Sequence, residues 1–274
     1  MNGFEMNVTN FQGTIFVEEN NAYKNEQKRA QRNQRMPPGM PSQDMMSFWG
    51  YKFETLSLLS KPWDPTTREE IEGRVDQIVN NKAQYCSVVR TGIGKSRLVI
   101  GGEVDAVWDC KPERKEDPIN WVELKTSAEI NNDRDMLKYE RKLLKFWAQS
   151  FLLGVPKIIV GFRNRDGILQ RLEELDTHSI PGKVKRFGKG TWDGNICINF
   201  TAEFLECECH FRVRCTGNSL SNTGLKTKVQ GEGLWRIRKR EKSPVIELFK
   251  VEEGGHGDII SPAFKAWRAE MSGS

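Results

Sequence analysis

The sequence predicts an α/β fold in which mixed, largely antiparallel β-sheets are flanked by helices. Residues 84–162 have the order strand, hairpin, helix, strand, which is the pattern of a sheet with helices on its faces. The last third of the chain has two more strand-like runs, 234–238 and 245–251, spaced to form a hairpin. A chain of 274 residues can bury a large core, and no composition shift marks a domain linker. We therefore expect a single domain over 1–274, with a mobile loop at 216–232.

The first sixty residues predict one strand and one helix that are joined by a polar connection. The run 11–17 alternates like a strand, whereas 20–43 is polar and ends in a proline-rich segment. Ser42 is a good N-cap, as is Asp44, for a helix over 45–59 that is apolar on most sides and so should be central. Glu54 is the exception on that helix. A buried carboxylate is costly unless it is paired with a cation or a metal.

A strand over 84–90 leads into the glycine-rich run 91–96. This run looks like a phosphate-binding loop, but Val89 stands where the first glycine of that motif is required. The run also lies between two strands and does not open a helix. We therefore predict a hairpin turn in which Gly92 and Gly94 supply the backbone freedom.

The clearest helix spans 132–153 and is followed by a strand over 157–162. Gly154 and Pro156 mark the end of the helix. Its apolar residues recur at steps of three and four, as expected for one buried face; they are Met136, Tyr139, Leu143, Trp147 and Phe151. The opposite side is polar and carries Arg141, Lys142, Lys145 and, at its border, Gln149.

The end of the chain predicts a strand over 196–211 and a short helix over 263–270. Three cysteines and a histidine fall close together near the end of that strand, and they are Cys207, Cys209, His210 and Cys215. A zinc site is one interpretation, but one residue between the first two cysteines departs from the usual spacing of two to four. Ordinary reduced thiols on a strand are the favoured alternative.

Charge and targeting signals place few limits on function. The net charge of +5 is too small by itself to indicate nucleic-acid binding. Basic clusters at 28–32 and 235–240 are consistent with solvated surfaces. No apolar run is long enough to span a membrane, and the first residues lack the order of a signal peptide. We expect an intracellular protein with no membrane association.

Acidic side chains alternate on two strand-like stretches in the middle of the chain. Glu103 and Asp105 share one strand face, and Glu123 and Lys125 share another, because successive strand side chains point to opposite faces. A hairpin centred near Arg114 would place Asp105 opposite Glu123, and Glu103 opposite Lys125. Three acids and one amine would then lie within a few ångströms of one another.

Such a cluster predicts a site for a hard divalent cation. Clustered carboxylates repel one another unless a cation lies among them, and oxygen ligands favour Mg²⁺ or Mn²⁺. A bound ion of this kind activates water and accepts phosphate oxygens, and Lys125 would add a positive charge beside the phosphate. An acid–x–lysine pair preceded by an acid on the neighbouring strand is the arrangement of PD-(D/E)xK nucleases. The spacing is only moderately specific, and a surface ion pair is the alternative.

These residues and their surroundings resemble the DXO family of decapping exoribonucleases. The matching stretches follow the family order over roughly residues 7–205, which is far more specific than any single motif. They are 11–14, 50–54, 85–90, 102–105, 122–127, 144–151, 154–156, 161–163 and, weakly, 197–200. The resemblance implies a PD-(D/E)xK nuclease-like core within a single decapping-nuclease-like domain.

The resemblance also implies the roles of individual residues. The metal ligands would be Glu54, Glu103, Asp105, Glu123 and the backbone carbonyl of Leu124. These would hold Mg²⁺ or Mn²⁺, in two ions. The catalytic set would be the four acids together with Lys125, which faces the scissile phosphate. Substrate would be bound by Cys86, Glu103, Lys125 and Gln149.

The activity implied by the resemblance is hydrolysis at RNA 5′ ends in RNA quality control. Family members remove incomplete or non-canonical caps, such as NAD, and several degrade the exposed RNA from 5′ to 3′. The resemblance further implies a nuclear, and also cytoplasmic, location and a 5′–3′ exoribonuclease as a partner. The family places an arginine-bearing motif upstream of the first strand, and no arginine precedes Arg29 here. We expect either an N-terminally short form or a more open pocket.

Two alternatives stay open at this stage. One is a non-catalytic protein that stabilises a partner exoribonuclease. The other is a DNA nuclease of the same superfamily, which would cut without a preference for 5′ ends.

Overall fold

The computed structural model describes residues 3–32, 39–206, 213–215, 220–221, 225, 229, 233–252 and 259–272. The chain forms two compact units. One consists of Met1–Arg35, Ile93–Ser96 and Ile198–Ser274, and the other of Met36–Gly92 and Arg97–Cys197. We call the second of these the central unit, because it carries every candidate site residue. The expectation of a single domain remains a prediction.

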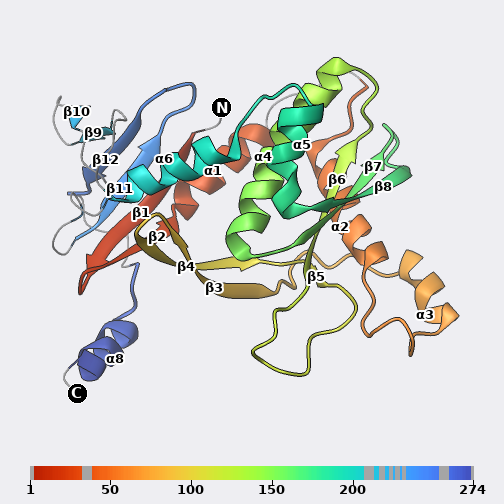
Figure 1. The fold of residues 1–274 in the computed structure, drawn as a ribbon, viewed down its shortest axis with the longest axis horizontal. Coiled ribbons are helices and arrows are strands. Elements are labelled where there is room, and N and C mark those ends of the chain that lie inside the picture. Colours follow the sequence, from red (N-terminus) through yellow and green to blue (C-terminus); the bar gives the residue numbers. More distant parts are fainter. Residues whose placement is uncertain are drawn as a thin grey trace. The chain divides into compact units, whose positions relative to one another are not determined.

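The central unit is built on a four-stranded mixed sheet in the order β5–β6–β7–β8 (Figure 1). The strands are β5 (Ala106–Val107), β6 (Trp121–Ala128), β7 (Lys157–Arg163) and β8 (Leu169–Asp176). Strands β6 and β7 are parallel, and α4 (Asp133–Leu153) connects them, while the other pairs are antiparallel. This is the mixed α/β arrangement that the sequence predicts.

Helix α4 begins and ends where the sequence predicts. The side chain of Asn132 accepts a hydrogen bond from the Asp135 amide at the start, and Gly154 ends the helix with φ +70°. One side is buried and is formed by Tyr139, Glu140, Leu143, Trp147, Ser150 and Leu153. Apolar spacing in the sequence therefore identified the packed face, apart from the buried Glu140.

Helix α2 (Gln43–Ser57) packs across the sheet through Phe53, which contacts Val122 and Leu124 of β6. Ser42 is its N-cap, as predicted. The expectation that this helix is central and buried on most sides is wrong, because Met45 and Phe48 are about half exposed and Phe53 is its one buried residue among those described.

The remaining elements of the central unit are short. They are α3 (Arg68–Glu72), η1 (Gly73–Val75), η2 (Thr177–Ser179), α5 (Ile180–Phe187) and the two-stranded sheet of β3 (Cys86–Ile93) and β4 (Ser96–Glu103). Gly94, in the turn between β3 and β4, has φ +58°, a conformation that glycine adopts without strain. The predicted hairpin is therefore confirmed, but the role predicted for Gly92 is wrong, because Gly92 lies within β3 and has no positive φ. Helix α6 (Gly194–Glu206) follows α5 in the chain.

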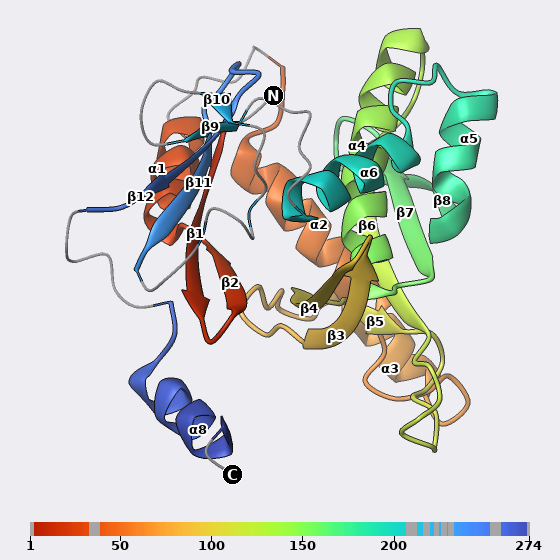
Figure 2. The same cartoon turned by 60° about the vertical axis from the view of Figure 1, so that its left-hand side comes forward.

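The other unit contains a six-stranded sheet in the order β10–β9–β12–β11–β1–β2, with α1 packed against β1 (Figure 2). Its strands are β1 (Phe4–Phe11), β2 (Thr14–Glu19), β9 (Val213–Cys215), β10 (Leu220–Ser221), β11 (Trp235–Lys239) and β12 (Ile246–Lys250). Its helices are α1 (Asn21–Arg32) and α8 (Pro262–Ser272). The buried residues of its core are Val8, Leu225, Val229, Ile237 and Leu248.

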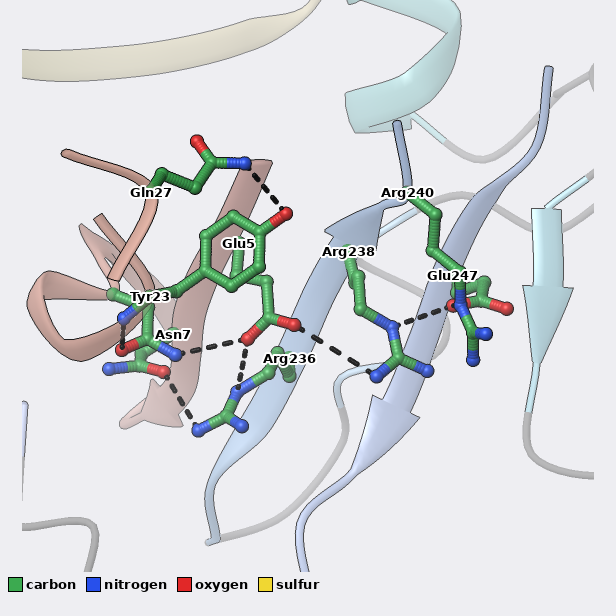
Figure 3. Close-up of polar contacts among 9 residues, drawn as sticks. Glu5, Asn7, Tyr23, Gln27, Arg236, Arg238, Arg240 and Glu247 are labelled. Carbon is green, nitrogen blue, oxygen red and sulfur yellow. Dashed lines mark hydrogen bonds and ion pairs between the residues drawn. The ribbon is translucent and has the colours of Figure 1, made fainter. Parts of the chain in front are cut away.

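The three arginines of the basic cluster at 235–240 pair with two carboxylates on one face of this sheet (Figure 3). Arg238 pairs with Glu247 at 2.7 Å, and Arg240 contacts the same carboxylate at 3.3 Å. Arg236 and Arg238 also lie 3.7 and 3.9 Å from Glu5, across the β1–β11 pairing. The three arginines therefore share two carboxylates, and this cluster stabilises neighbouring strands.

Several predicted elements differ from the structure. The run 11–17 is not one strand, because Gln12 and Gly13 form the turn between β1 and β2. The polar connection 20–43 contains α1, and 196–211 is helical through Glu206. Cys207, Cys209 and His210 lie outside the described residues, as does most of the predicted loop 216–232.

Two C-terminal predictions are confirmed. Strands β11 and β12 form the expected antiparallel hairpin, and α8 covers the predicted short helix. Among the described residues, no helix is both long and apolar enough to cross a membrane.

Candidate metal centre

The register between β5 and β6 is the one that the sequence predicts. Ala106 pairs with Val122, and Val107 pairs with Trp121, so Asp105 comes next in line with Glu123. The ladder ends at Ala106, and the Asp105 carboxylate accepts a hydrogen bond of 2.7 Å from the Leu124 amide. Asp105 is thereby held against β6 at the Leu124 peptide.

The predicted pairing of Glu103 with Lys125 is wrong, because Glu103 ends β4 in a different sheet. The intervening Val104 is buried, and its amide donates to the Tyr85 carbonyl at 3.0 Å. The chain therefore leaves the β3–β4 sheet before it joins β6. Glu103 and Asp105 nevertheless line one cavity.

Glu123 is the most buried acid of the site, with 1% of its side chain exposed. Its Oε1 atom accepts a hydrogen bond of 2.8 Å from the Gln149 amide of α4 and pairs with the ammonium group of Lys125. Its Oε2 atom is buried and has no hydrogen-bond partner. A buried carboxylate oxygen without a partner is costly in free energy, and a bound cation would remove that cost.

Glu54, Glu103 and Asp105 line a cavity of about 800 Å³ in the central unit. Glu54 projects from α2, and Glu103 is held by a hydrogen bond of 3.1 Å from Gln84. The cavity is also lined by Tyr51, Arg74, Gln77, Asn80 and Tyr85. It combines acids with aromatic and amide side chains, as expected for a cavity that takes a polar ligand.

Two acids of the site, Glu54 and Glu123, have a raised pKa. Burial raises the pKa of Glu54 to about 7, and the charges of Asp105, Glu103 and Glu123 add to this effect while Lys125 opposes it. Burial also raises the pKa of Glu123, which Lys125 lowers in part. These couplings link the acids of α2, β4 and β6 into a single electrostatic site.

The donor set fits a hard divalent ion. Four carboxylates supply only oxygen ligands, which Mg²⁺ and Mn²⁺ prefer. The Oε2 atom of Glu123 lacks a partner, and burial together with the neighbouring acids raises the pKa of Glu54. Within the described part of the chain, no group of three or more Asp, Glu, His or Cys side chains is placed so that it could hold a metal ion. The carbonyl ligand expected at Leu124 stays a prediction.

The structure divides the predicted substrate residues into two groups. Gln149 and Lys125 both contact Glu123 and so belong to the centre. Cys86 is exposed on β3, and its sulfur lies beside Gly101 on the face of the hairpin that also carries Glu103. It does not line the cavity, although its neighbour Tyr85 does.

Sequence reasoning did not identify Gln84, which orients Glu103. The side chain lies just before β3, and its amide reaches across to the end of β4. The one indication of its role in the sequence was its position two residues before Cys86, next to the open end of the hairpin. A single polar residue at the edge of a strand carries no specific pattern.

Comparisons with known proteins identify the family of this chain. Residues 1–265 match the family model described as RAI1 like PD-(D/E)XK nuclease. The decapping nuclease RAI1 of Aspergillus fumigatus is 68% identical over 98% of this chain and 68% of its own length. The protein of that name from Emericella nidulans is 63% identical, with the same shares covered.

Solved structures give the same result. Candida albicans Rai1 in complex with pU5 and Mn²⁺ superposes with a TM-score of 0.78 at 27% identity, over 98% of this chain and 70% of that one. Scheffersomyces stipitis Rai1 in complex with (3′-NADP)⁺ and calcium gives a TM-score of 0.75 at 27% identity, over 98% of this chain and 69% of that one. The chain therefore belongs to the RAI1-like family of PD-(D/E)XK decapping nucleases.

Proposed function

We propose that the protein is a metal-dependent hydrolase that removes incomplete or non-canonical caps, such as NAD, from RNA 5′ ends. The observation that carries this proposal is the buried Glu123, which is held by Lys125 and Gln149, keeps one oxygen without a partner and is coupled electrostatically to Glu54, Glu103 and Asp105. The pU5 and (3′-NADP)⁺ ligands of the related structures support RNA 5′ ends and dinucleotide-like caps as the substrate class.

The four acids would hold Mg²⁺ or Mn²⁺, in two ions, and such ions activate water and neutralise phosphate oxygens when bound. Gln149 and Lys125 fix the Glu123 carboxylate, so that its free oxygen points to one position. Lys125, one-quarter exposed, also supplies positive charge where negative charge grows on the phosphate. Asp105 is fixed by the Leu124 amide and shares the cavity with Glu54 and Glu103.

Further degradation of the RNA from 5′ to 3′ is part of the proposal, as are a nuclear and cytoplasmic location and a 5′–3′ exoribonuclease partner. These follow from the family resemblance alone.

The test is to incubate the purified protein with 5′-NAD-RNA and 5′-triphosphate-RNA in the presence of Mg²⁺ or Mn²⁺. Released cap and mononucleotides are separated by chromatography. Wild type should release the intact cap, and the Glu103→Ala variant should be slower by orders of magnitude. Indistinguishable wild-type and variant reactions with both ions would refute the proposal.

A non-catalytic stabiliser of an exoribonuclease is the second candidate. The one observation that favours it is that no three acids yet converge on one point in the described residues. A pull-down that recovers a nuclease, combined with an inactive isolated protein, would support it. Equal cutting of RNA and DNA without a 5′ preference would instead indicate a DNA nuclease.

A further inference from the structure

Helix α4 carries a straight row of three lysines and one glutamine, and the glutamine lies at the metal centre. Its members lie three or four residues apart, and at 3.6 residues per turn they fall within about 60° of arc. We call this row the α4 stripe, and it consists of Lys138, Lys142, Lys145 and Gln149. Each of the four residues is exposed as a whole, although the ammonium end of Lys142 is buried, and the row is about 16 Å long at 1.5 Å per residue.

Two hydrogen bonds fix the stripe against β6. Gln149 donates to Glu123 at 2.8 Å, and Lys142 donates to the Ser127 hydroxyl at 3.2 Å. Going from Glu123 to Ser127 along β6 corresponds to going from Gln149 to Lys142 along α4, so the two elements are antiparallel here. Lys125 lies between these two contacts on the same face of β6, since alternate strand residues share a face.

The positive charge of the stripe is not balanced locally. Lys138 pairs with Asp135 of its own helix at 3.1 Å. Across the residues that the structure describes, neither Lys142 nor Lys145 forms an ion pair with a carboxylate. Burial of the Lys142 ammonium lowers its pKa, and the charges of Arg163 and Lys138 act in the same direction. Like charges are therefore gathered at this end of β6, where an anion would stabilise them.

Arg163 extends this positive region at the end of β7. It is the last residue of β7 and pairs with Ala128 in the β6–β7 ladder, next to Ser127. Its guanidinium lies 4.2 Å from the Trp49 ring, and its Nη1 atom donates to the Asn164 carbonyl at 3.4 Å. Arg163 therefore adds a positive charge to this end of the sheet, which favours a nearby phosphate.

We propose that the α4 stripe binds the phosphate backbone of the RNA body, from the metal centre at Gln149 towards Lys138. This inference rests on the proposed function, because it assumes that the 5′ end of a single-stranded RNA lies at the metal centre. The stripe contacts phosphate groups and not bases, so its affinity for RNA is independent of the RNA sequence and depends strongly on the salt concentration.

The test measures the salt dependence of RNA binding. The probe is a 5′-phosphorylated single-stranded RNA of about 20 nucleotides with a 3′ fluorophore, and its anisotropy is titrated over a range of KCl concentrations with Ca²⁺ present. The Lys142→Gln/Lys145→Gln variant should lower the slope of log K against log [salt] by about 1.4, because each lost contact with a single strand removes about 0.7. The matched control is Lys183→Gln/Lys185→Gln on α5, which removes the same charge from two exposed lysines of the same unit.

Two results would overturn the inference. One is an unchanged slope in the stripe variant, and the other is an equal fall of the slope in the α5 control. Cleavage of NAD-RNA is measured in parallel, since failure of the proposed function has a different signature. If the wild type cleaves no RNA, the proposed activity is refuted. If the slope of log K against log [salt] still falls in the stripe variant, the stripe is supported as an RNA-binding surface.

Discussion

Gln149 of α4 and Glu123 of β6 are joined by a 2.8 Å hydrogen bond from the side-chain amide to Oε1. This bond and the Lys125 contact occupy one carboxylate oxygen and leave the other free. The helix therefore controls the direction of the free oxygen. Groups that orient metal ligands in this way typically contribute 10–100-fold to metal affinity or to activity.

Replacing Gln149 should therefore weaken the centre without unfolding the protein. We expect Gln149→Ala to lower the decapping rate by about 10–100-fold, because Glu123 loses one of its two fixed contacts. Gln170→Ala is the matched control, since Gln170 is exposed on β8 and its side-chain amide donates to the nearby Ile168 carbonyl. Cleavage of NAD-RNA at saturating Mn²⁺ is the measurement, and equal rates for both variants would contradict the role of Gln149.

Lys125 should matter for the reaction and not for holding the metal. Lys125→Gln keeps a donor near Glu123 but removes the positive charge, so we expect the cleavage rate to fall by about 10²–10³-fold. Mn²⁺ binding, measured by calorimetry, should be unchanged or tighter, because one competing cation is gone. A loss of Mn²⁺ affinity that parallels the loss of rate would show that Lys125 acts through ligand geometry alone.

The stability of the metal-free protein should fall as the pH rises from about 4.5 to about 7. The pKa of Glu54 is about 7 in the folded chain and 4.5 ordinarily, so its contribution is complete below 4.5 and is lost as the carboxyl ionises. Because Glu54 is half-buried, we expect a change on the order of 1–2 kcal/mol in unfolding free energy.

Urea unfolding in EDTA, repeated between pH 5 and pH 8, measures this change. Glu54→Gln should flatten the pH dependence, and saturating Mn²⁺ should stabilise wild type more at pH 8 than at pH 5. A pH dependence identical in wild type and Glu54→Gln would assign it to other groups.

Glu140 should be important for folding and not for catalysis. It is 2% exposed on α4, and its carboxylate accepts hydrogen bonds from the backbone amides of Lys189 and Thr191 and from the Thr191 hydroxyl at 2.8 Å. Glu140→Ala leaves these donors without a partner, so we expect a loss of about 2–4 kcal/mol in unfolding free energy. Arg141→Ala, at the exposed neighbouring position, should change it by less than about 0.5 kcal/mol.

The sequence predicted those parts of the fold that nearby residues determine, such as helix ends and the register of a hairpin. The ends of α4 followed from Asn132 and Gly154, and the register of β5 and β6 followed from the position of the turn between them. Alternation could not show that Glu103 belongs to a different sheet from Lys125, because sheet membership depends on distant partners. The apolar residues of α2 likewise indicated burial, whereas the structure leaves Phe48 about half exposed.

Some features had no signal in the sequence. The sequence predicts a strand over 196–211, whereas residues 194–206 form α6, because short apolar runs fit either structure. The buried Glu140 was invisible because its donors are backbone amides about fifty residues away. The free oxygen of Glu123 was equally invisible, since it depends on which partners reach the other oxygen.

The end of the β5–β6 ladder has a practical consequence for inactivating this protein. The backbone pairing of β5 with β6 ends at Ala106, and the Leu124 amide of β6 donates to the side chain of Asp105. Asp105 therefore continues the hydrogen bonding of the sheet and also lines the cavity. A variant at Asp105 would disturb strand geometry together with chemistry, and its loss of activity would be ambiguous. Glu103 stands exposed at the end of β4, where the side chain of Gln84 is its hydrogen-bond partner among the described residues. A substitution of Glu103 is therefore the better way to obtain an inactive protein that still folds and binds RNA.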